Sequence, residues 1–229
     1  MPIRGYAHLF LVAGAFIAVC LLVRLVLVLL ERRRRRVLER AAEELGLRFS
    51  PGGAAAPAEA MQRLPLFWYG VQQRARNVLS GRIEDLRAWL FDYQYRVPYG
   101  TIEPDNTEAS LVPIQTVAVI RLAEDRLPDF EARPREAFAR RAPRRRGYHR
   151  VRLPEFPAFD ERYLVRGRDE AAVRAALTDE LLAYLLHRDG LCLDAGGPWL
   201  VVYRPQRRLA PSQMAELLEE AFEIGTILA

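Results

Sequence analysis

The chain has 229 residues, 51% of them hydrophobic and 28% charged, which suits one ordinary domain with an appendage and excludes a wholly disordered protein. All 34 basic residues are arginine, and without lysine there can be no ordinary P-loop, Schiff-base enzyme or Ser-Lys dyad. The net charge is +5, but taking the five consecutive arginines at residues 32–36 from the 34 leaves 29, which equals the number of acids. The net positive charge therefore comes from one local block of arginines, so we expect no binding to nucleic acid.

The cysteines and histidines are few and widely spaced. Cys20 lies within an apolar run and Cys192 lies far along the chain, so neither a disulfide framework nor a CxxC metal or redox site is possible. His8, His149 and His187 form no HExxH motif and no spacing typical of a ligand cluster. We therefore expect no metal ion and no cofactor.

Residues 9–30, LFLVAGAFIAVCLLVRLVLVLL, are uncharged except for Arg24. As a helix that rises about 1.5 Å per residue, this run reaches roughly 33 Å, which is enough to cross the hydrocarbon core of a bilayer. A cleaved signal peptide would carry its positive charge before the run and small residues at its end, whereas here the charge follows and the run ends in two leucines. We predict an uncleaved transmembrane helix over residues 9–30.

The arginines on the two sides of this run differ in number. Arg4 alone precedes it, whereas residues 32–36 and Arg40 follow it. The positive-inside rule then predicts a single-pass protein of the bacterial inner membrane, with residues 1–8 outside and residues 47–229 in the cytoplasm.

Residues 31–46 are predicted to continue the span as a basic juxtamembrane helix that ends at Gly46. Its arginine block should lie at the membrane interface, where each arginine gains about 1 kcal/mol from anionic lipid headgroups. Arg24, inside the span, is interpreted as snorkelling to the interface or pairing with another helix, in preference to a transport or signalling role. The five predicted interface residues are Arg32, Arg33, Arg34, Arg35 and Arg36.

After residues 50–60, a small-residue segment predicted to be a flexible loop, the periodicity changes from helix to strand. In residues 87–97, aromatic side chains alternate with mostly polar ones, which predicts a half-buried strand with one aromatic face. Residues 74–82 and 112–123 are predicted to be antiparallel neighbours, because the connections are too short for crossover helices. The aromatic face consists of Trp89, Phe91, Tyr93 and Tyr95.

Helical patterns are concentrated in the second half of the chain. Asp169 caps a helical stretch, Thr178 offers the start of a second helix within it, and Ser212 caps a final helix. Between them, residues 191–205 predict a hairpin that turns across residues 194–198. Strands followed mostly by helices indicate the α+β class: an antiparallel sheet with two to four helices after the membrane span.

In the order in which they occur, several short segments of this sequence resemble those of a family of bacterial single-pass, membrane-anchored proteins. No activity is assigned to that family. The resemblance runs from about residue 45 to residue 224. It implies a membrane anchor but brings no activity, cofactor or site residue to this chain. The segments that carry it are NVLSG (77–81), FDYQY (91–95), LPDFEARP (Leu127–Pro134), FDERYLVRGRDEAAVR (159–174) and LVVYRP (200–205).

A second basic segment, ARRAPRRRGYHR, occupies residues 139–150. Nine arginines lie between residues 133 and 152, against the single acid Glu136. The simpler interpretation is a solvated loop, and the alternative is a patch that touches anionic lipid headgroups or an acidic partner, since the tether keeps it near the bilayer. The arginines of this patch are Arg140, Arg141, Arg144, Arg145 and Arg146.

Two further patterns bear on chemistry. The aromatic face could stack nucleic-acid bases, although a strand with one aromatic face is more often part of a core. Five acids lie beside aromatic residues and prolines, where a pair could perform acid–base chemistry, but carboxylates next to arginines usually form solvated ion pairs. We therefore assign no catalytic residue. The five acids are Asp92, Asp129, Glu155, Asp160 and Glu161.

The leading hypothesis is a binding or scaffold module held at the inner membrane. Its expected partners are the lipid bilayer, anionic lipid headgroups and another membrane protein. The alternative is a membrane-tethered enzyme that uses carboxylates, namely a hydrolase.

Overall fold

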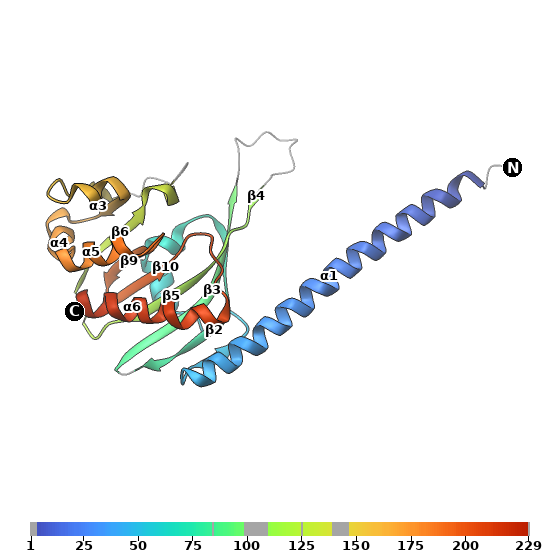
Figure 1. Ribbon diagram of the computed structural model, residues 1–229, viewed down its shortest axis with the longest axis horizontal. Helices are drawn as coiled ribbons and strands as arrows, with labels where there is room; N and C mark the ends of the chain where they lie inside the picture. The colour runs from blue at the N-terminus through green and yellow to red at the C-terminus, as the bar shows by residue number, and fades with distance from the viewer. Residues whose placement is uncertain (1–3, 84, 99–109, 125, 139–146, 229) are drawn as a thin grey trace.

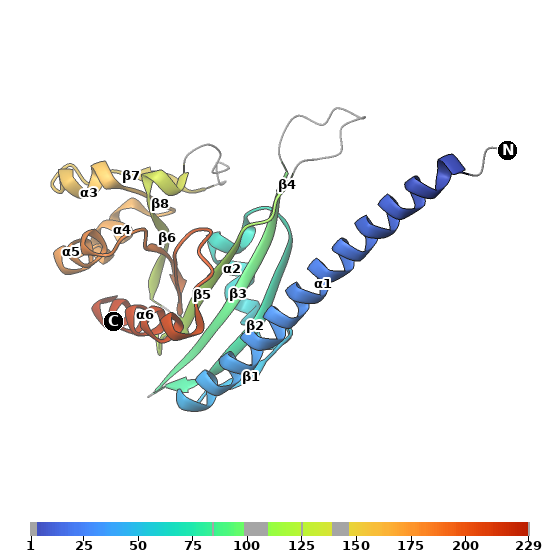
Figure 2. The same ribbon diagram turned by 45° about the vertical axis from the view of Figure 1, so that its right-hand side comes forward.

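The computed structural model describes residues 4–83, 85–98, 110–124, 126–138 and 147–228, and shows a long helix that leads into a sheet flanked by helices (Figure 1). This helix, α1 (Arg4–Glu44), has 41 residues, and its N-terminal part extends away from the rest of the protein (Figure 2). The apolar side chains there are exposed, Phe16 to 69% and Leu21 to 62%. Burial against the protein therefore cannot account for their apolar character.

In the described part of the chain, α1 alone is long and apolar enough to cross a membrane, over a stretch whose mean hydropathy reaches 2.8. By length and composition it is a membrane anchor or a signal sequence. The predicted apolar helix and its continuation through the arginine block are confirmed, since one uninterrupted helix covers both.

Nine strands among the described residues form one antiparallel sheet, and a short tenth, β4 (Ser110–Leu111), pairs with the end of β3. The predicted antiparallel arrangement of the first strands and the hairpin over residues 191–205 are confirmed. The turn of the hairpin is shorter than the predicted 194–198, because Asp194, Ala195 and Gly196 are already paired with β10. In their order across the sheet, the strands are β1 (Arg48–Ser50), β2 (Val71–Ile83), β3 (Leu86–Pro98), β5 (Ile114–Arg121), β10 (Trp199–Tyr203), β9 (Cys192–Gly197), β6 (Leu127–Pro134), β8 (Tyr163–Gly167) and β7 (His149–Val151).

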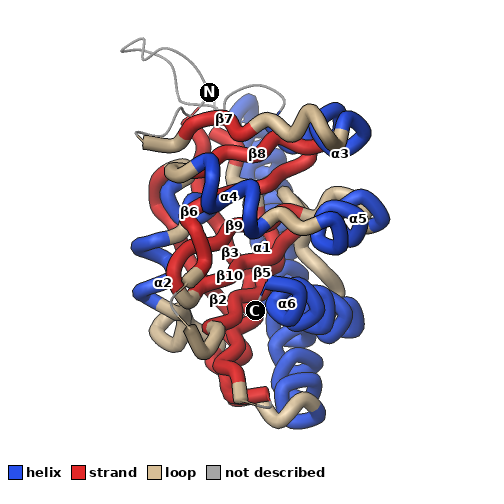
Figure 3. Tube along the Cα trace, turned by 90° about the vertical axis from the view of Figure 1, so that its left-hand side faces the viewer, coloured by secondary structure: helices blue, strands red, loops and turns tan. Residues whose placement is uncertain are grey.

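Helices cover both faces of this sheet, as the view in Figure 3 shows. One face carries only α2 (Ala58–Arg63) and the 3-10 turn η1 (Pro65–Trp68) among the described residues. The other face carries the last turns of α1 together with the remaining helices. The α+β class is therefore confirmed. The remaining helices are α3 (Pro157–Arg162), α4 (Glu170–Ala176), α5 (Asp179–His187) and α6 (Met214–Leu228), with 3-10 turns η2 (Arg135–Phe138) and η3 (Pro211–Gln213).

The strand β3 lies between two apolar layers, one on each face of the sheet, and contributes side chains to both. Phe91 and Tyr93 are fully buried beneath α2 and η1, so the aromatic face is a core face, as the simpler interpretation predicted. The prediction that the strand is only half buried was wrong, because Leu90 and Asp92 on its opposite side are buried as well. Two helix layers, and not one, cover this strand.

Two of the three predicted helix caps are confirmed. The side chain of Asp169 accepts a hydrogen bond from the amide of Ala172 at the start of α4, and Thr178 does the same for Leu181 at the start of α5. Ser212 does not cap α6, because it lies inside the turn η3 that precedes this helix. The loop predicted over residues 50–60 ends early, since α2 begins at Ala58.

Candidate functional site

The last turns of α1 lie against the sheet along one side of the helix. Leu38 and Ala42 are buried there, and one and two turns earlier the same side presents Arg34 and Glu31, both partly buried. Side chains three or four positions apart share one side of a helix, so these residues form a continuous stripe. The apolar end of the stripe packs on the sheet, and its charged end meets Asp92.

Asp92, in the middle of β3, is 2% exposed and lies at the centre of a charged network. Arg34 holds it from α1 at two points, with Nη2 2.9 Å from Oδ1 and Nε 3.2 Å from Oδ2. Arg208 approaches from the segment after β10, with Nη2 2.8 Å from Oδ2. Thr116 on β5 also donates to Oδ1, at 3.2 Å. Every oxygen of this buried carboxylate is therefore satisfied.

Glu31 adds a second acid from α1. Its Oε2 lies 2.9 Å from Nη2 of Arg208, so Arg208 joins the helix to the sheet through two carboxylates at once. Arg34 and Arg208 balance the charges of Glu31 and Asp92. We call these four residues and Asn77 the junction network. Its neutrality matters because a buried charge without a partner costs several kcal/mol.

Asn77 enters the junction network through an irregularity in β2. Its φ is +53°, and the register between β2 and β3 shifts between Arg76 and Leu79, which marks a β-bulge. Asparagine tolerates this left-handed conformation better than most residues. The side chain of Asn77 is fully buried and donates to Glu31 at 2.9 Å and to Asp92 at 3.0 Å. The bulge thus directs one amide into the contact between helix and sheet.

Two opposing effects set the pKa of Asp92. Burial raises this pKa, but the hydrogen bond from Arg208 and the charge and hydrogen bond of Arg34 together outweigh it. The net pKa of Asp92 is below its ordinary value, so the carboxylate stays charged and keeps its partners at neutral pH. The contact is therefore an ion pair, not a neutral hydrogen bond.

The five arginines predicted at the membrane interface point in different directions. Arg32, Arg33 and Arg36 are exposed, whereas Arg34 is directed at Asp92 and Arg35 lies 3.9 Å from Glu31. One side of the block therefore faces the sheet and the other faces solvent. The second predicted patch lies outside the described residues, and it consists of Arg140, Arg141, Arg144, Arg145 and Arg146.

Three of the other candidate acids are paired with arginines. Asp129 contacts Arg63 at 3.3 Å and Arg168 at 3.5 Å, while Glu155 contacts Arg174 at 2.6 Å. The remaining paired acid is Asp160, whose carboxylate lies 3.3 Å from Arg150. Glu161 is exposed. The ion-pair interpretation is confirmed for these three acids. For Asp92 the expectation of a solvated pair was wrong, because its side chain is only 2% exposed.

A second buried charge cluster fastens η1 to the sheet. Arg133 on β6 lies with Nη2 3.1 Å from Asp194 and 2.9 Å from Glu131, and its guanidinium lies 4.6 Å from the ring centre of Tyr69. Asp194 also accepts the amide hydrogen of Leu66 in η1. Burial lowers the pKa of Arg133, but the charges of Asp194 and Glu131 and the neighbouring tyrosines together outweigh burial and raise this pKa well above its ordinary value. Arg133 therefore stays charged, and its ion pairs with Asp194 and Glu131 help to hold η1 against the sheet.

Sequence reasoning missed that Arg34, Asn77 and Arg208 donate hydrogen bonds to Asp92. It also missed that Glu31 joins the same network through Asn77 and Arg208. The spacing of Glu31 and Arg34 on one helix face was visible in the sequence, but nothing local indicated that Arg208 would meet them. For metals, the structure gathers no three His, Cys, Asp or Glu side chains into a set that could hold an ion, among the residues it describes.

These features define a class: an α+β domain on an antiparallel sheet, with an N-terminal apolar helix locked to that sheet by buried charges. No model of a protein family matches the chain, and a search of curated proteins gives no match. Among solved structures, the fold is similar to the crystal structure of the mycobacterial trehalose monomycolate transport factor A, TtfA. The TM-score is 0.59 at 16% identity, over 86% of this chain and 93% of that chain. At this identity the likeness establishes a shared fold.

Proposed function

We propose that the protein is a membrane-anchored factor in the transport of a cell-envelope lipid, and that its α+β domain is a binding module rather than an enzyme. The observation that carries this proposal is the fold shared with TtfA, a trehalose monomycolate transport factor, in a chain that also has an N-terminal apolar helix. The lipid class suggested is a long-chain glycolipid. The pairing of the candidate acids with arginines supports binding over hydrolysis.

In this proposal α1 spans the inner membrane once, over residues 9–30, and residues 47–229 lie in the cytoplasm. The support is the surplus of arginines after the apolar run. Arg32, Arg33 and Arg36, which are exposed on α1, would contact anionic headgroups. A reporter fused after the last residue that is active only on the outer side would contradict this orientation.

The protein would act together with another membrane protein. A single helix cannot enclose a path for a lipid, since known transporters build such paths from several helices. Arg24 is exposed within the apolar part of α1 and would be available to an acidic side chain of that partner. The junction network would then hold the α+β domain against the partner in one orientation.

The proposal is tested by depleting the protein in its native host and following newly made envelope lipids with labelled acetate. We expect an acylated sugar to accumulate inside the cell and to diminish at the surface, and the full-length chain to restore its export. Cross-linking in intact membranes should then recover a protein with several transmembrane helices. An unchanged distribution of labelled glycolipids after depletion would contradict the proposal.

A further inference from the structure

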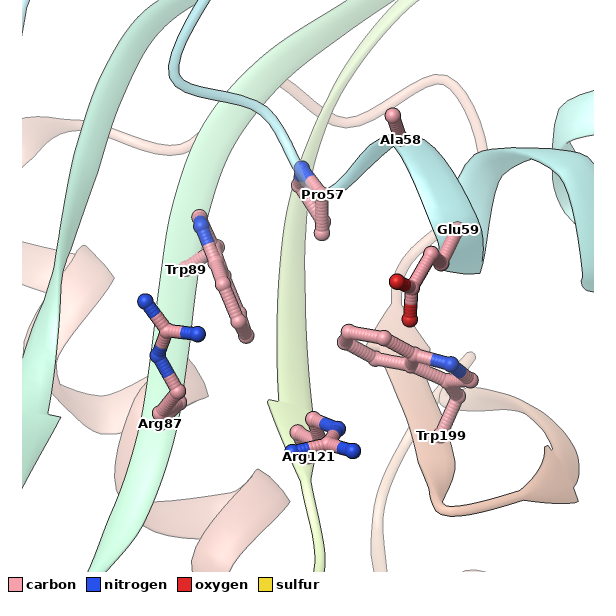
Figure 4. A pocket seen from close by; sticks show the side chains of 7 residues that line it. All are labelled: Pro57, Ala58, Glu59, Arg87, Trp89, Arg121 and Trp199. Atoms are coloured by element: carbon pink, nitrogen blue, oxygen red, sulfur yellow. The ribbon is translucent and has the colours of Figure 1, made fainter.

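A hollow of about 320 Å³ lies on the face of the sheet that carries α2, at the edge of the aromatic layer (Figure 4). Trp89 on β3 and Trp199 on β10 form its base, Arg87 and Arg121 flank them, and Glu59 at the start of α2 overhangs Trp199. It is separate from the junction network, which lies on the opposite face. A volume near 300 Å³ is at the lower end of small-molecule sites, so it suits one ring with a small substituent.

The two arginines are brought together by the strand register. Arg87 on β3 is directly opposite Arg121 on β5, and Arg121 is directly opposite Trp199 on β10, so all three point to the same face. Like charges directly opposite each other destabilise a sheet. Among the residues that the structure describes, neither arginine forms an ion pair with an acid, and both are exposed. Such a pair is well placed to hold an anion between its two guanidinium groups.

Each guanidinium also lies beside an indole. The Cζ atom of Arg87 is 5.6 Å from the ring centre of Trp89, and that of Arg121 is 5.8 Å from the ring centre of Trp199. Contact with an aromatic ring limits the rotamers of a long arginine side chain, which reduces the entropy lost when a ligand binds. The cationic groups are therefore positioned next to an aromatic surface.

The arrangement of the two indoles selects the shape of the ligand. Their ring centres are 5.6 Å apart and their planes are tilted by 52°. Two rings this close and this tilted cannot sandwich a flat nucleobase, which needs parallel faces on both sides. Trp89 is 9% exposed and Trp199 is 5% exposed, so the two indoles offer only a narrow, angled apolar surface. The edge of a saturated ring can rest there with its C–H groups toward the indoles. Glu59 lies across this surface as a hydrogen-bond acceptor for a hydroxyl group.

We propose that this hollow binds a sugar phosphate. The phosphate bridges Arg87 and Arg121, the sugar ring rests against Trp89 and Trp199, and Glu59 accepts a hydrogen bond from a ring hydroxyl. The phosphate also relieves the repulsion between the two arginines.

The same chemistry, a saturated ring with hydroxyl groups and a phosphate, occurs in free sugar phosphates and in the inositol phosphate headgroups of phospholipids. The position of the hollow favours the free compound. Along β3, Trp89 lies three residues closer to the β2–β3 turn than Asp92, the residue that Arg34 of α1 contacts. The apolar part of α1 extends away from that turn (Figures 1 and 2). A headgroup in the bilayer would have to extend past the junction network to reach it.

The test is isothermal titration calorimetry of the full-length protein in detergent micelles, with glucose 6-phosphate, inorganic phosphate and glucose as separate probes. We expect glucose 6-phosphate to bind about tenfold or more tightly than either other compound, because only it uses both halves of the hollow. In a parallel experiment, the protein is titrated with vesicles that contain phosphatidylinositol 4-phosphate. Binding to those vesicles with none to glucose 6-phosphate would support the headgroup source of the same chemistry.

Substitutions of residues that line the hollow test whether glucose 6-phosphate binds there. Arg87→Gln combined with Arg121→Gln should weaken glucose 6-phosphate binding about tenfold or more, and Glu59→Gln should weaken glucose 6-phosphate but not inorganic phosphate. These side chains are exposed, so the variants should fold. The matched control is Arg74→Gln, which removes an exposed arginine of β2 outside the hollow and should change nothing. Equal affinity for inorganic phosphate, undiminished binding in the double variant, or no binding in either experiment would overturn the proposal.

Discussion

Arg34 and Asp92 are 58 residues apart in the chain and are joined by two hydrogen bonds of 2.9 and 3.2 Å. One belongs to the helix that carries the apolar run, and the other belongs to the middle of the sheet. Because Asp92 is buried, this pair is shielded from the solvent that weakens ion pairs at a surface. The direction in which α1 leaves the sheet is thus fixed by a specific contact.

Replacing Asp92 with alanine should destabilise the α+β domain by about 3–5 kcal/mol, because it leaves Arg34, whose side chain is only 14% exposed, without its acid and opens a gap in the buried network. The measurement is urea unfolding in detergent, followed by tryptophan fluorescence. Asp189→Ala is the matched control, since Asp189 is 97% exposed and pairs with Arg162 at the surface. Its cost should remain below about 1 kcal/mol. Equal costs for the two variants would show that the junction network contributes nothing special to stability.

The junction network should also make stability depend on acid pH. Burial raises the pKa of Asp92, but Arg208 and Arg34 lower it more, so this pKa is lower in the folded protein than in the unfolded chain. Its contribution is therefore complete above the unfolded pKa and is lost as the pH falls from about 4 through the folded pKa. The wild-type protein should lose unfolding free energy more steeply below about pH 4 than Asp92→Asn does. Parallel pH profiles would contradict this assignment.

Arg33 and Arg34 are neighbours with different predicted roles. Arg34→Ala should loosen α1 from the sheet and increase hydrogen exchange around Leu38, with little effect on binding to anionic vesicles. Arg33→Ala, on the exposed side, should leave hydrogen exchange unchanged and weaken vesicle binding, by about 1 kcal/mol per arginine. If both variants affect the same measurement equally, the division of the block into two sides is wrong.

Cys192 should be inert toward thiol reagents in the folded protein. It is fully buried on β9, and burial raises the pKa of its thiol to about 12, so almost no thiolate exists at pH 8. In a Cys20→Ser variant, a maleimide should label no cysteine until urea is added. Rapid labelling without denaturant would show that this part of the sheet opens readily.

The parts of the fold that depend on short-range patterns could be predicted from the sequence. The caps Asp169 and Thr178 act on amides three residues away, and the alternation around Phe91 reflects the pleat of one strand. The strand β6 was not predicted, because three of its residues are charged and charged residues usually indicate an exposed segment. Arg133 and Glu131 are instead buried together, which no local pattern shows.

The candidate site escaped prediction for the same reason. The hydrogen bonds of the junction network join residues that are 15 to 177 positions apart. Asp92 was identified as a candidate acid, but its partners became visible only when β2, β5 and the segment after β10 were placed around it. In the hollow, Arg87, Trp89, Arg121 and Trp199 all belong to predicted strands, but only the sheet register shows that they are neighbours.

The contact between α1 and the sheet also limits the space between the membrane and the α+β domain. Arg34 lies only four residues beyond Leu30, the last residue of the apolar run, and α1 is helical without interruption between them. That separation is about 6 Å along the axis, which is less than the 10 Å diameter of one helix. With α1 across the bilayer as proposed, no further layer of protein fits between the membrane and the part of the sheet around Asp92. A partner must therefore reach the α+β domain from its flank or through the bilayer itself.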